Sequence, residues 1–508
     1  MWRRKLLQRE KIYDIFVIGG GVNGCGIARD AVGRGLTVCL AEMNDIGSGT
    51  SSASTKLIHG GLRYLKYFDF RLVKESLKER EVLLANMPHI CWPMRFILPS
   101  PKKILRRIIV RLGLLLYDNL GGRTKLPGSK NIRLKHSNFG TVLKKQFSSA
   151  FLFSDCWVED SRLVVLNAMD ARKRGAQILT RTKVKAIERE EKYWKIITED
   201  PNGKVREFFS HSIVNATGPW VDTFDNISSR VNRPIHLVRG SHLVVKRMFD
   251  HDHSYFLLGD DGRIIFVIPY QKEFTLIGTT EQPHENINLR PTCSREEAMY
   301  LIDFVNSYFD CPIGLEKVVW SYSGIRPLYQ KLGVKKGSLS SMTRDYMLNL
   351  ESNGGLPILT VYGGKLTTYR KLSENVLSKL NSFFPKMLGP WTSHNPLPGG
   401  DFMHEEKDSL VEGLCEKYPF LDREWSQRLV NGYGTLSEKV LGNAKTKRDL
   451  GIDFGNSLTE KEVRWLIEYE FAESEEDILW RRTKLGLKFS KKQKDSLSKW
   501  FKTLLERH

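Results

Sequence analysis

Three glycines near the start of the chain have the spacing of a dinucleotide-binding turn. Gly19, Gly21 and Gly24 give the pattern G-x-G-x-x-G directly after the apolar run 15–18. In this pattern the first glycine permits a tight turn, the second lets the backbone approach a pyrophosphate, and the third lets the next helix pack closely. The N-terminus of that helix offers free N–H groups to phosphate oxygens. The apolar run predicts a strand that is buried on both faces of a parallel sheet.

A second strand and an acidic residue support this interpretation. The apolar run 36–41 ends in Glu42, about 20 positions after the glycines, where the adenosine ribose is bound in such folds. A glycine turn in an unrelated α/β unit is the alternative. Strand, turn, helix-like stretch (26–32), strand and acid follow one another in the required order, so the sequence predicts a bound dinucleotide.

A loop of small and hydroxyl-bearing residues follows at 47–55, where a nicotinamide enzyme would continue with ordinary βαβ units. Such a loop supplies many N–H and O–H donors, and its small side chains let a flat ring system approach the backbone. A flexible linker has a similar composition. Residues 56–65, however, are apolar and basic, which a solvated linker does not require. The loop therefore favours a flavin.

Residues 47–65 resemble the flavin loop of the FAD-dependent glycerol-3-phosphate dehydrogenases, within the wider family of D-amino-acid-oxidase-like flavoproteins. Residues 214–220, 323–327 and 361–370 resemble further motifs of that family, in the same order, and the resemblance is strong over residues 12–400. It implies that FAD is bound by Gly19, Gly20, Gly21, Asn23, Gly24, Glu42, Thr50, Ser51, Ser52, Ser54, Lys56, Leu57, Ala216, Gly218, Gly364, Leu366 and Thr367.

Residues 239–242 and 277–280 also resemble family signatures. One departure is Glu281, which follows Gly-Thr-Thr where the family pattern leads us to expect aspartate. The longer side chain could shift a local contact without changing the chemistry.

The resemblance implies the oxidation of sn-glycerol 3-phosphate to dihydroxyacetone phosphate. A hydride leaves C2 for the flavin, a base takes the hydroxyl proton, and cations hold the phosphate, which arginine matches best. Arg63, Arg326 and Lys365 are the candidate cations, because each lies inside a motif that matches the family. An ordinary surface charge is the alternative for any single arginine.

His59 is the candidate general base, since an unperturbed histidine has a pKa of about 6.5. A histidine that packs on the flavin, or supports the site from behind, is the alternative. Arg326 would in addition stabilise the developing alkoxide, and Tyr64 would complete the substrate pocket. The turn at 363–364 would open a helix whose N-terminus stabilises negative charge on the reduced flavin.

The resemblance also implies that electrons pass to a membrane quinone. An oxidase that uses O₂ would share the substrate loop, so the acceptor stays open. An amino-acid oxidase would lack a phosphate pocket with three cations, and a flavin-binding structural protein would lack the set His59, Arg63, Arg326 and Lys365. The oligomeric state stays open too, and a homodimer is compatible with the sequence.

Composition limits the class of protein. A chain of 508 residues with 41% hydrophobic residues is expected to form two or three domains. Its seven cysteines contain no C-x-x-C pair, which argues against a zinc site or a disulfide framework and favours a reducing compartment. We find no secretory signal and no apolar run of the roughly 18 residues that a membrane span needs. These features predict a cytoplasmic protein.

The net charge of +21 is concentrated before residue 401, because the remainder holds 20 basic and 21 acidic residues. Residues 101–150 contain twelve Lys or Arg and one acid, Asp118. On a helical wheel, 104–117 has one apolar arc flanked by arginines, the pattern of a helix lying on a membrane. Packing on the domain core is the equal alternative, whereas no nucleic-acid-binding motif is present. The patch predicts peripheral association with the anionic inner face of the cell membrane.

The order of strand-like and helical runs predicts an α/β protein with three parts. These are a Rossmann-type FAD-binding domain (about 12–90, 156–230 and 320–390), an inserted α+β substrate domain with an antiparallel sheet (about 91–155 and 231–319), and a C-terminal helical cap (396–508). Within the cap, 460–471 and 478–487 have helical patterns. Thr459 and Glu462 have the spacing of a capping box.

Overall fold

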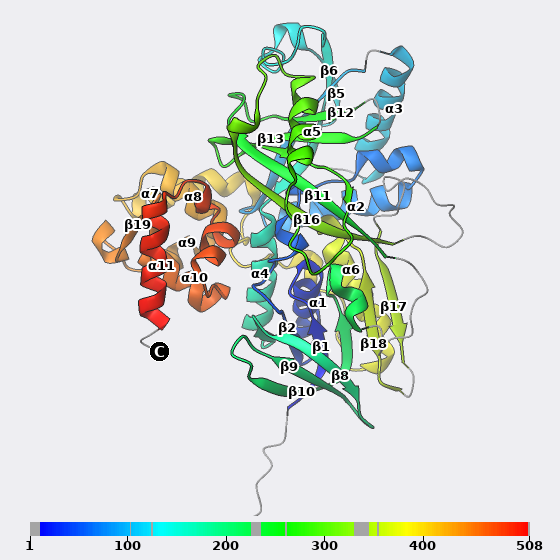
Figure 1. The fold of residues 1–508 in the computed structure, drawn as a ribbon, viewed down its shortest axis with the longest axis vertical. Helices are drawn as coiled ribbons and strands as arrows, with labels where there is room; N and C mark the ends of the chain where they lie inside the picture. The colour runs from blue at the N-terminus through cyan, green and yellow to red at the C-terminus, as the bar shows by residue number, and fades with distance from the viewer. Residues whose placement is uncertain are drawn as a thin grey trace, which may run out of the picture.

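A computed structural model describes residues 11–101, 103–122, 125–224, 235–259, 262–329, 345–352 and 355–505. Two large sheets and a C-terminal group of helices make up the molecule (Figure 1). The predicted fold class, a Rossmann-type domain with a second, largely antiparallel domain and a helical C-terminal domain, is confirmed.

The first sheet is built around the strand that precedes the glycine turn. β1 (Ile12–Ile18) lies between two parallel neighbours, and the strand order is β17-β18-β10-β1-β2-β7. Its central residues Ile15, Phe16 and Val17 are fully buried, which explains the continuous apolar run. An antiparallel pair, β8 and β9, extends the sheet beside β10. The remaining bounds are β2 Val38–Ala41, β7 Gln177–Leu179, β8 Lys183–Arg189, β9 Trp194–Glu199, β10 Val205–Asn215, β17 Met347–Glu351 and β18 Ile358–Tyr362.

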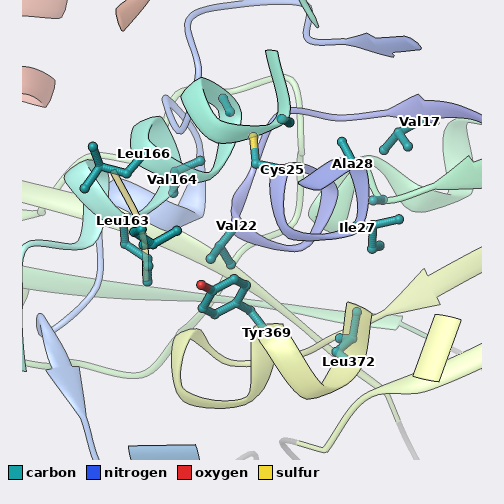
Figure 2. Close-up of a cluster of buried hydrophobic side chains, with 14 of the residues drawn as sticks. Val17, Val22, Cys25, Ile27, Ala28, Leu163, Val164, Leu166, Tyr369 and Leu372 are labelled. Carbon is teal, nitrogen blue, oxygen red and sulfur yellow. The ribbon is translucent and has the colours of Figure 1, made fainter. Parts of the chain in front are cut away.

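Three helices pack together against this sheet. They are α1 (Val22–Gly33), α4 (Asp160–Lys173) and α6 (Tyr369–Leu380). Figure 2 shows their shared core, in which Val22 of α1, Leu163 of α4 and Tyr369 of α6 approach one another. Helix α1 extends the predicted 26–32 at both ends. Its N-terminus begins directly after the glycine turn, as a dinucleotide site requires.

The second sheet has the order β15-β11-β14-β13-β12-β4-β6-β3, with β16 beside β11 and β5 beside β6. It is antiparallel except between β12 and β4. Strands β3 and β16 lie in segments that the sequence assigned to FAD binding, yet both pair in this sheet. Bounds are β3 Leu57–Ile58, β4 Cys91–Pro99, β5 Lys130–Arg133, β6 Ser149–Val158, β11 Ile235–Lys246, β12 Ser254–Leu258, β13 Ile264–Tyr270, β14 Phe274–Gly278, β15 Gln282–Pro283, β16 Val318–Tyr329 and helix α5 Arg295–Asn306.

The C-terminal domain stands beside the two sheets as a separate group of helices with its own apolar core (Figure 1). It also contains a short β-hairpin, β19 (Asp453–Gly455) and β20 (Leu458–Thr459), which the prediction of an all-helical cap missed. The stretch predicted as a helix at 478–487 is a π-helical turn (Asp477–Arg482) and a 3₁₀ turn (Leu485–Leu487). The long helices are α7 Lys407–Lys417, α8 Arg423–Tyr433, α10 Glu460–Glu470 and α11 Lys491–Leu505.

The predicted capping box at the start of α10 is wrong. Among the described residues, the side chain of Thr459 makes no capping hydrogen bond. Glu462 instead accepts hydrogen bonds from Arg428 (2.6 and 2.7 Å) and from the hydroxyl of Tyr433 (2.7 Å). A charge-assisted pair with a buried carboxylate is stronger than the local backbone bond that a capping box offers.

Two further helices, α2 (Phe70–Asn86) and α3 (Ile104–Leu120), contact each other, and α2 also contacts β4. Of the residues of α3, Leu114 and Tyr117 are buried, whereas the apolar side chains toward its N-terminal end face solvent. Figure 1 shows α3 at the periphery of the molecule. Within the described part of the chain, no helix combines the length and hydrophobicity that a membrane crossing requires.

Candidate active site

A cavity of about 840 Å³ lies where the first sheet meets the second. Its wall combines the β1–α1 turn, the loop 42–64, the end of β10, part of β16 and the turn between β18 and α6. Strands β3 and β16 connect the cavity to the second sheet, so residues from both domains reach it. An elongated ligand can therefore bind to the first domain and present its far end to the second.

The glycine turn closes one end of this cavity. Gly19 has a φ of +106°, and a Cβ there would lie 2.7 Å from the carbonyl oxygen of Ala216. A Cβ on Gly24 would lie 1.9 Å from the carbonyl oxygen of Gly19, so α1 can approach β1 this closely only with glycine. Ser51 accepts a hydrogen bond from the N–H of Val22 (3.0 Å). The hydroxyl-rich loop is thus tied to the N-terminus of α1, where a pyrophosphate would bind.

Glu42 lies beside the turn, as predicted for a ribose ligand. Its carboxylate accepts hydrogen bonds from the N–H groups of Gly20 (2.6 Å) and Asn44 (2.9 Å). Burial raises the pKa of Glu42, while these two donors oppose the rise. The residues Thr182, Lys183 and Val184 line the same end of the cavity and were missed by the sequence, because no local motif marks them.

Most of the predicted FAD ligands line the cavity. Those in its wall are Gly19, Gly21, Asn23, Glu42, Thr50, Ser51, Ser54, Leu57, Ala216, Gly218, Gly364, Leu366 and Thr367. Four others, Gly20, Gly24, Ser52 and Lys56, lie outside the wall that the described residues form.

Lys56 has a clear reason to point away from the cavity. Its Nζ lies 2.7 Å from Oδ1 of Asp160 at the start of α4, and both side chains are fully buried. Asp160 also accepts a hydrogen bond from the hydroxyl of Ser54 (2.8 Å). Burial alone would raise the pKa of Asp160, but Lys56 and Lys484 outweigh it and the pKa is lowered. The Lys56 side chain therefore anchors the hydroxyl-rich loop to α4.

All five predicted catalytic residues line the other end of the cavity: His59, Arg63, Tyr64, Arg326 and Lys365. The backbone N–H of His59 donates to the hydroxyl of Thr367 (3.2 Å), which fixes the segment after β3 against the start of α6. The Nζ of Lys365 lies 4.2 Å from the ring centroid of Tyr64. The structure thus brings together side chains that are up to about 300 residues apart in the sequence.

The two arginines share contacts with residues of the second sheet. Arg326 donates through Nη2 to the hydroxyl of Thr279 (3.1 Å). Glu281 lies 3.4 Å from Arg63 and 3.9 Å from Arg326, measured from Oε1 to each Nη1. Thr279 was not among the predicted site residues, although it lies in the family signature at 277–280, which could have indicated its place in the site. Glu281 was noted only as a departure.

His242 is a second histidine near the cavity, from the signature at 239–242. Its Nε2 lies 2.9 Å from the hydroxyl oxygen of Thr55, and its ring stacks on Tyr322 with centroids 4.8 Å apart. Burial, followed by the charges of Arg326 and Lys56, lowers its pKa well below the ordinary value. His242 is therefore neutral and supports the loop rather than carrying charge.

These features fit FAD. The glycine cradle at Gly19 and the start of α1 suit a pyrophosphate, and Glu42 suits the adenosine ribose. At the other end, Asn23 of α1 donates to the carbonyl of Gly363 (3.1 Å), so the β18–α6 turn closes on the same cavity. Small residues line this wall and leave room for a flat ring system.

Comparison with known proteins agrees with this geometry. Residues 14–370 match the family model described as FAD dependent oxidoreductase, and residues 390–507 match the C-terminal domain of alpha-glycerophosphate oxidase. The chain is 45% identical to D-erythritol 1-phosphate dehydrogenase of Brucella abortus and 43% identical to aerobic glycerol-3-phosphate dehydrogenase of Escherichia coli. Each match covers 96% of this chain and 97% of the relative.

Solved structures show the same fold. The glycerol-3-phosphate dehydrogenase from Bacillus halodurans, complexed with FAD, superposes with a TM-score of 0.75 at 24% identity and covers 97% of this chain and 94% of its own. L-alpha-glycerophosphate oxidase from Mycoplasma pneumoniae superposes with a TM-score of 0.61 at 16% identity, over 76% of this chain and 99% of its own. The chain belongs to the FAD-dependent oxidoreductase family, with FAD as its cofactor.

Proposed function

We propose that this protein oxidises sn-glycerol 3-phosphate to dihydroxyacetone phosphate. The observation that carries the proposal is the convergence of His59, Arg63, Arg326 and Lys365 at one end of the cavity. Three cations suit a phosphate ester, and one adjacent imidazole suits a hydroxyl that must lose its proton. The relative from Escherichia coli carries the corresponding name at 43% identity.

Each residue then has a defined task. Arg63 and Arg326 bind the phosphate through charge-assisted hydrogen bonds, and Lys365, positioned over Tyr64, adds a third positive charge to the phosphate site. His59 accepts the proton of the C2 hydroxyl, and Arg326 stabilises the negative charge that develops on that oxygen. FAD, held by residues of the cavity wall such as Gly19 and Ser51, would supply the acceptor for the hydride of C2.

A longer polyol phosphate is a second candidate substrate, because the relative from Brucella abortus is named for D-erythritol 1-phosphate. Both candidates carry the phosphate that the cations require. The test mixes the purified yellow protein anaerobically with glycerol 3-phosphate, D-erythritol 1-phosphate, glycerol, lactate or an amino acid. We expect glycerol 3-phosphate to bleach the flavin band fastest. Faster bleaching by the erythritol ester would reassign the substrate, and bleaching by an amino acid alone would reject both candidates.

We further propose that α3 docks the protein on the anionic inner face of the cell membrane, where quinone accepts the electrons. Ile104 is 77% exposed and Leu112 is 60% exposed, and the rest of the predicted arc, Leu105, Ile108, Ile109, Leu115 and Leu116, is exposed as well. Exposed arginines, including Arg106 and Arg107, flank it. A large exposed apolar surface with basic neighbours suits a lipid surface better than water.

The membrane proposal is tested by co-sedimentation with lipid vesicles. Binding should increase with the anionic lipid fraction, since each basic residue near such a surface contributes about 1 kcal/mol. High salt should remove only part of it, because the buried apolar side chains contribute independently of salt. Rates with a soluble quinone and with O₂, measured on the same preparation, identify the acceptor. Faster turnover with O₂ would make the protein an oxidase.

A further inference from the structure

A carboxylate lies inside the proposed phosphate site. The side chain of Glu281 is 13% exposed, and those of Arg63 and Arg326 are 17% and 23% exposed. All three line the cavity, and Glu281 is within ion-pair distance of both arginines. The two groups that we assign to the substrate phosphate thus already face a negative charge of the protein itself.

A phosphate that binds here must compete with this carboxylate. Two like charges within a few ångströms in a partly buried site repel each other, so phosphate and Glu281 cannot both occupy the arginines without a large cost. Thr279 binds Nη2 of Arg326, whereas Glu281 lies near Nη1, so the hydrogen bond to Thr279 does not depend on Glu281. Arg326 can therefore stay in position when the Glu281 side chain turns away.

We propose that Glu281 is an internal counter-ion that competes for Arg63 and Arg326, so that free inorganic phosphate does not fill the site while a phosphate ester still binds. The inference rests on the proposed function. Both ligands must displace Glu281 at the same cost. An ester gains further contacts beyond its phosphate, at His59 and the flavin, which offset this cost, whereas inorganic phosphate lacks them and stays weakly bound.

The test is the Glu281→Gln variant, which keeps the shape of the side chain and removes its charge. Glu285→Gln is the matched control, because Glu285 is an exposed acid four residues further along the chain, beyond β15. Two quantities are measured on flavin-loaded protein: the dissociation constant of inorganic phosphate, from the perturbed flavin spectrum, and the KM for glycerol 3-phosphate with a soluble dye.

We expect Glu281→Gln to tighten phosphate binding about tenfold, the effect of one charge-assisted contact, and to lower the KM as well, because the ester phosphate displaces the same carboxylate. The side chain of Glu281→Asp is shorter and cannot reach both arginines equally. Its dissociation constant for inorganic phosphate should therefore lie between those of the wild type and Glu281→Gln. For the control Glu285→Gln, both the phosphate dissociation constant and the KM should stay within about twofold of the wild-type values. Unchanged phosphate binding in both Glu281 variants would overturn the proposal. A raised KM with unchanged phosphate binding would overturn it as well and would instead indicate that Glu281 binds a substrate hydroxyl.

The two proposals fail in different ways. If glycerol 3-phosphate does not reduce the wild-type flavin, the proposed substrate is wrong. The phosphate titration still shows whether Glu281 competes with phosphate for the two arginines. If the wild type turns over and the titration is unchanged by Glu281→Gln, only the role of Glu281 is wrong. If Glu281→Gln loses its flavin, the phosphate titration of Glu281→Asp tests the role of Glu281 instead: tighter phosphate binding than in the wild type supports the proposal, and unchanged binding overturns it.

Discussion

The cations at the substrate end have partners of several kinds. Arg326 donates to a neutral hydroxyl and shares the carboxylate of Glu281 with Arg63, and Lys365 lies over an aromatic ring. None of these contacts is a fully buried ion pair of the kind that Lys56 makes with Asp160. Removing one of the three cations should therefore affect ligand binding more than folding, because only an uncompensated buried charge destabilises strongly.

The first prediction concerns the arginines. Arg326→Ala and Arg63→Ala should each weaken glycerol 3-phosphate binding by roughly 1.5–3 kcal/mol, the contribution of a charge-assisted hydrogen bond. That corresponds to a loss of about ten- to a hundredfold in kcat/KM. Flavin content should hardly change. Arg290→Ala, which removes an arginine whose side chain is 86% exposed, is the control. If both site variants keep full activity, the phosphate binds elsewhere.

The second prediction concerns His59. His59→Asn should slow flavin reduction by about 10²–10⁴-fold, the usual contribution of a general base, and weaken substrate binding less. The backbone hydrogen bond from residue 59 to Thr367 does not depend on the side chain, so the segment should keep its position. Rapid-mixing reduction kinetics across pH measure the effect. Loss of FAD with an unchanged rate per remaining flavin would assign His59 a packing role.

Sequence motifs located the residues around the cavity but not the direction of every side chain. The five catalytic candidates lie in short motifs whose backbone shape is local, so position in the motif predicted position in the site. Lys56 lies in such a motif too, yet the direction of its side chain is set by the ion pair with Asp160, about 100 residues away in the sequence. Glu281 can act as a counter-ion to Arg326 only because β16 places Arg326 beside it in the folded chain. Contacts of this kind depend on the tertiary fold, which spacing does not encode.

At the level of elements, α3 has two distinct faces. Its apolar arc is exposed, so the alternative that this arc packs on the core is not what the structure shows. A helical wheel cannot distinguish the two cases, because a helix that packs on a core and a helix that lies on a membrane both have one apolar face. The other face holds the buried Tyr117, whose hydroxyl accepts the N–H of Gly60 (2.7 Å) and donates to Asp155 (2.8 Å). One helix thus connects the exposed surface to the residue after His59.

The third prediction tests the exposed face. Ile108→Asp with Leu112→Asp should abolish vesicle binding and quinone reduction, since two charges would enter the lipid interface. Reduction of a soluble dye should stay near the wild-type rate, because both side chains point to solvent. Ile108→Ser with Leu112→Ser is the uncharged control and should weaken binding less. Loss of the dye reaction in the Asp variant would contradict a surface role.

The fourth prediction tests the buried face. Tyr117→Phe should lower the stability by about 1–3 kcal/mol, because the N–H of Gly60 and the carboxylate of Asp155 lose a buried partner. Arg80, 2.9 Å from Asp155, remains to balance its charge. The thermal midpoint of the flavin-loaded protein measures the change. An unchanged midpoint would mean that other groups satisfy both atoms.

At the scale of the whole molecule, buried charge pairs help to attach the C-terminal domain, beside apolar contacts such as Trp480 stacked on Trp320. Arg482 binds Asp45 (2.6 and 2.7 Å), and Arg162 binds Glu470 (3.0 Å). The sequence predicted a separate helical domain at 396–508 from the helical patterns within it. It could not predict these pairs, because their partners lie more than 300 residues apart.

The last prediction follows from a histidine at this junction. His89 is fully buried, Lys407 of α7 donates to its carbonyl oxygen (3.2 Å), and its ring lies 6.4 Å from that of Phe402. Burial, with the charges of Arg162 and Lys407, lowers the pKa of His89 well below its ordinary value. The folded protein therefore keeps His89 neutral at a pH where the unfolded chain already binds a proton, so this residue destabilises the fold as the pH falls below about 6.5.

Several buried carboxyls, among them Glu42 and Asp155, have a raised pKa, so on acidification they take up a proton at a higher pH in the folded than in the unfolded state and oppose this trend. The measurement is therefore a comparison of thermal midpoints at pH 7.5 and 5.5 between the wild type and His89→Gln, which cannot titrate. The variant should lose less stability on acidification, by up to about 1.4 kcal/mol per pH unit, the linkage for one proton. His136→Gln changes an exposed histidine and is the control. Equal acid sensitivity of the wild type and His89→Gln would show that the junction already admits a charged imidazole, and that the C-terminal domain is not held against a neutral His89.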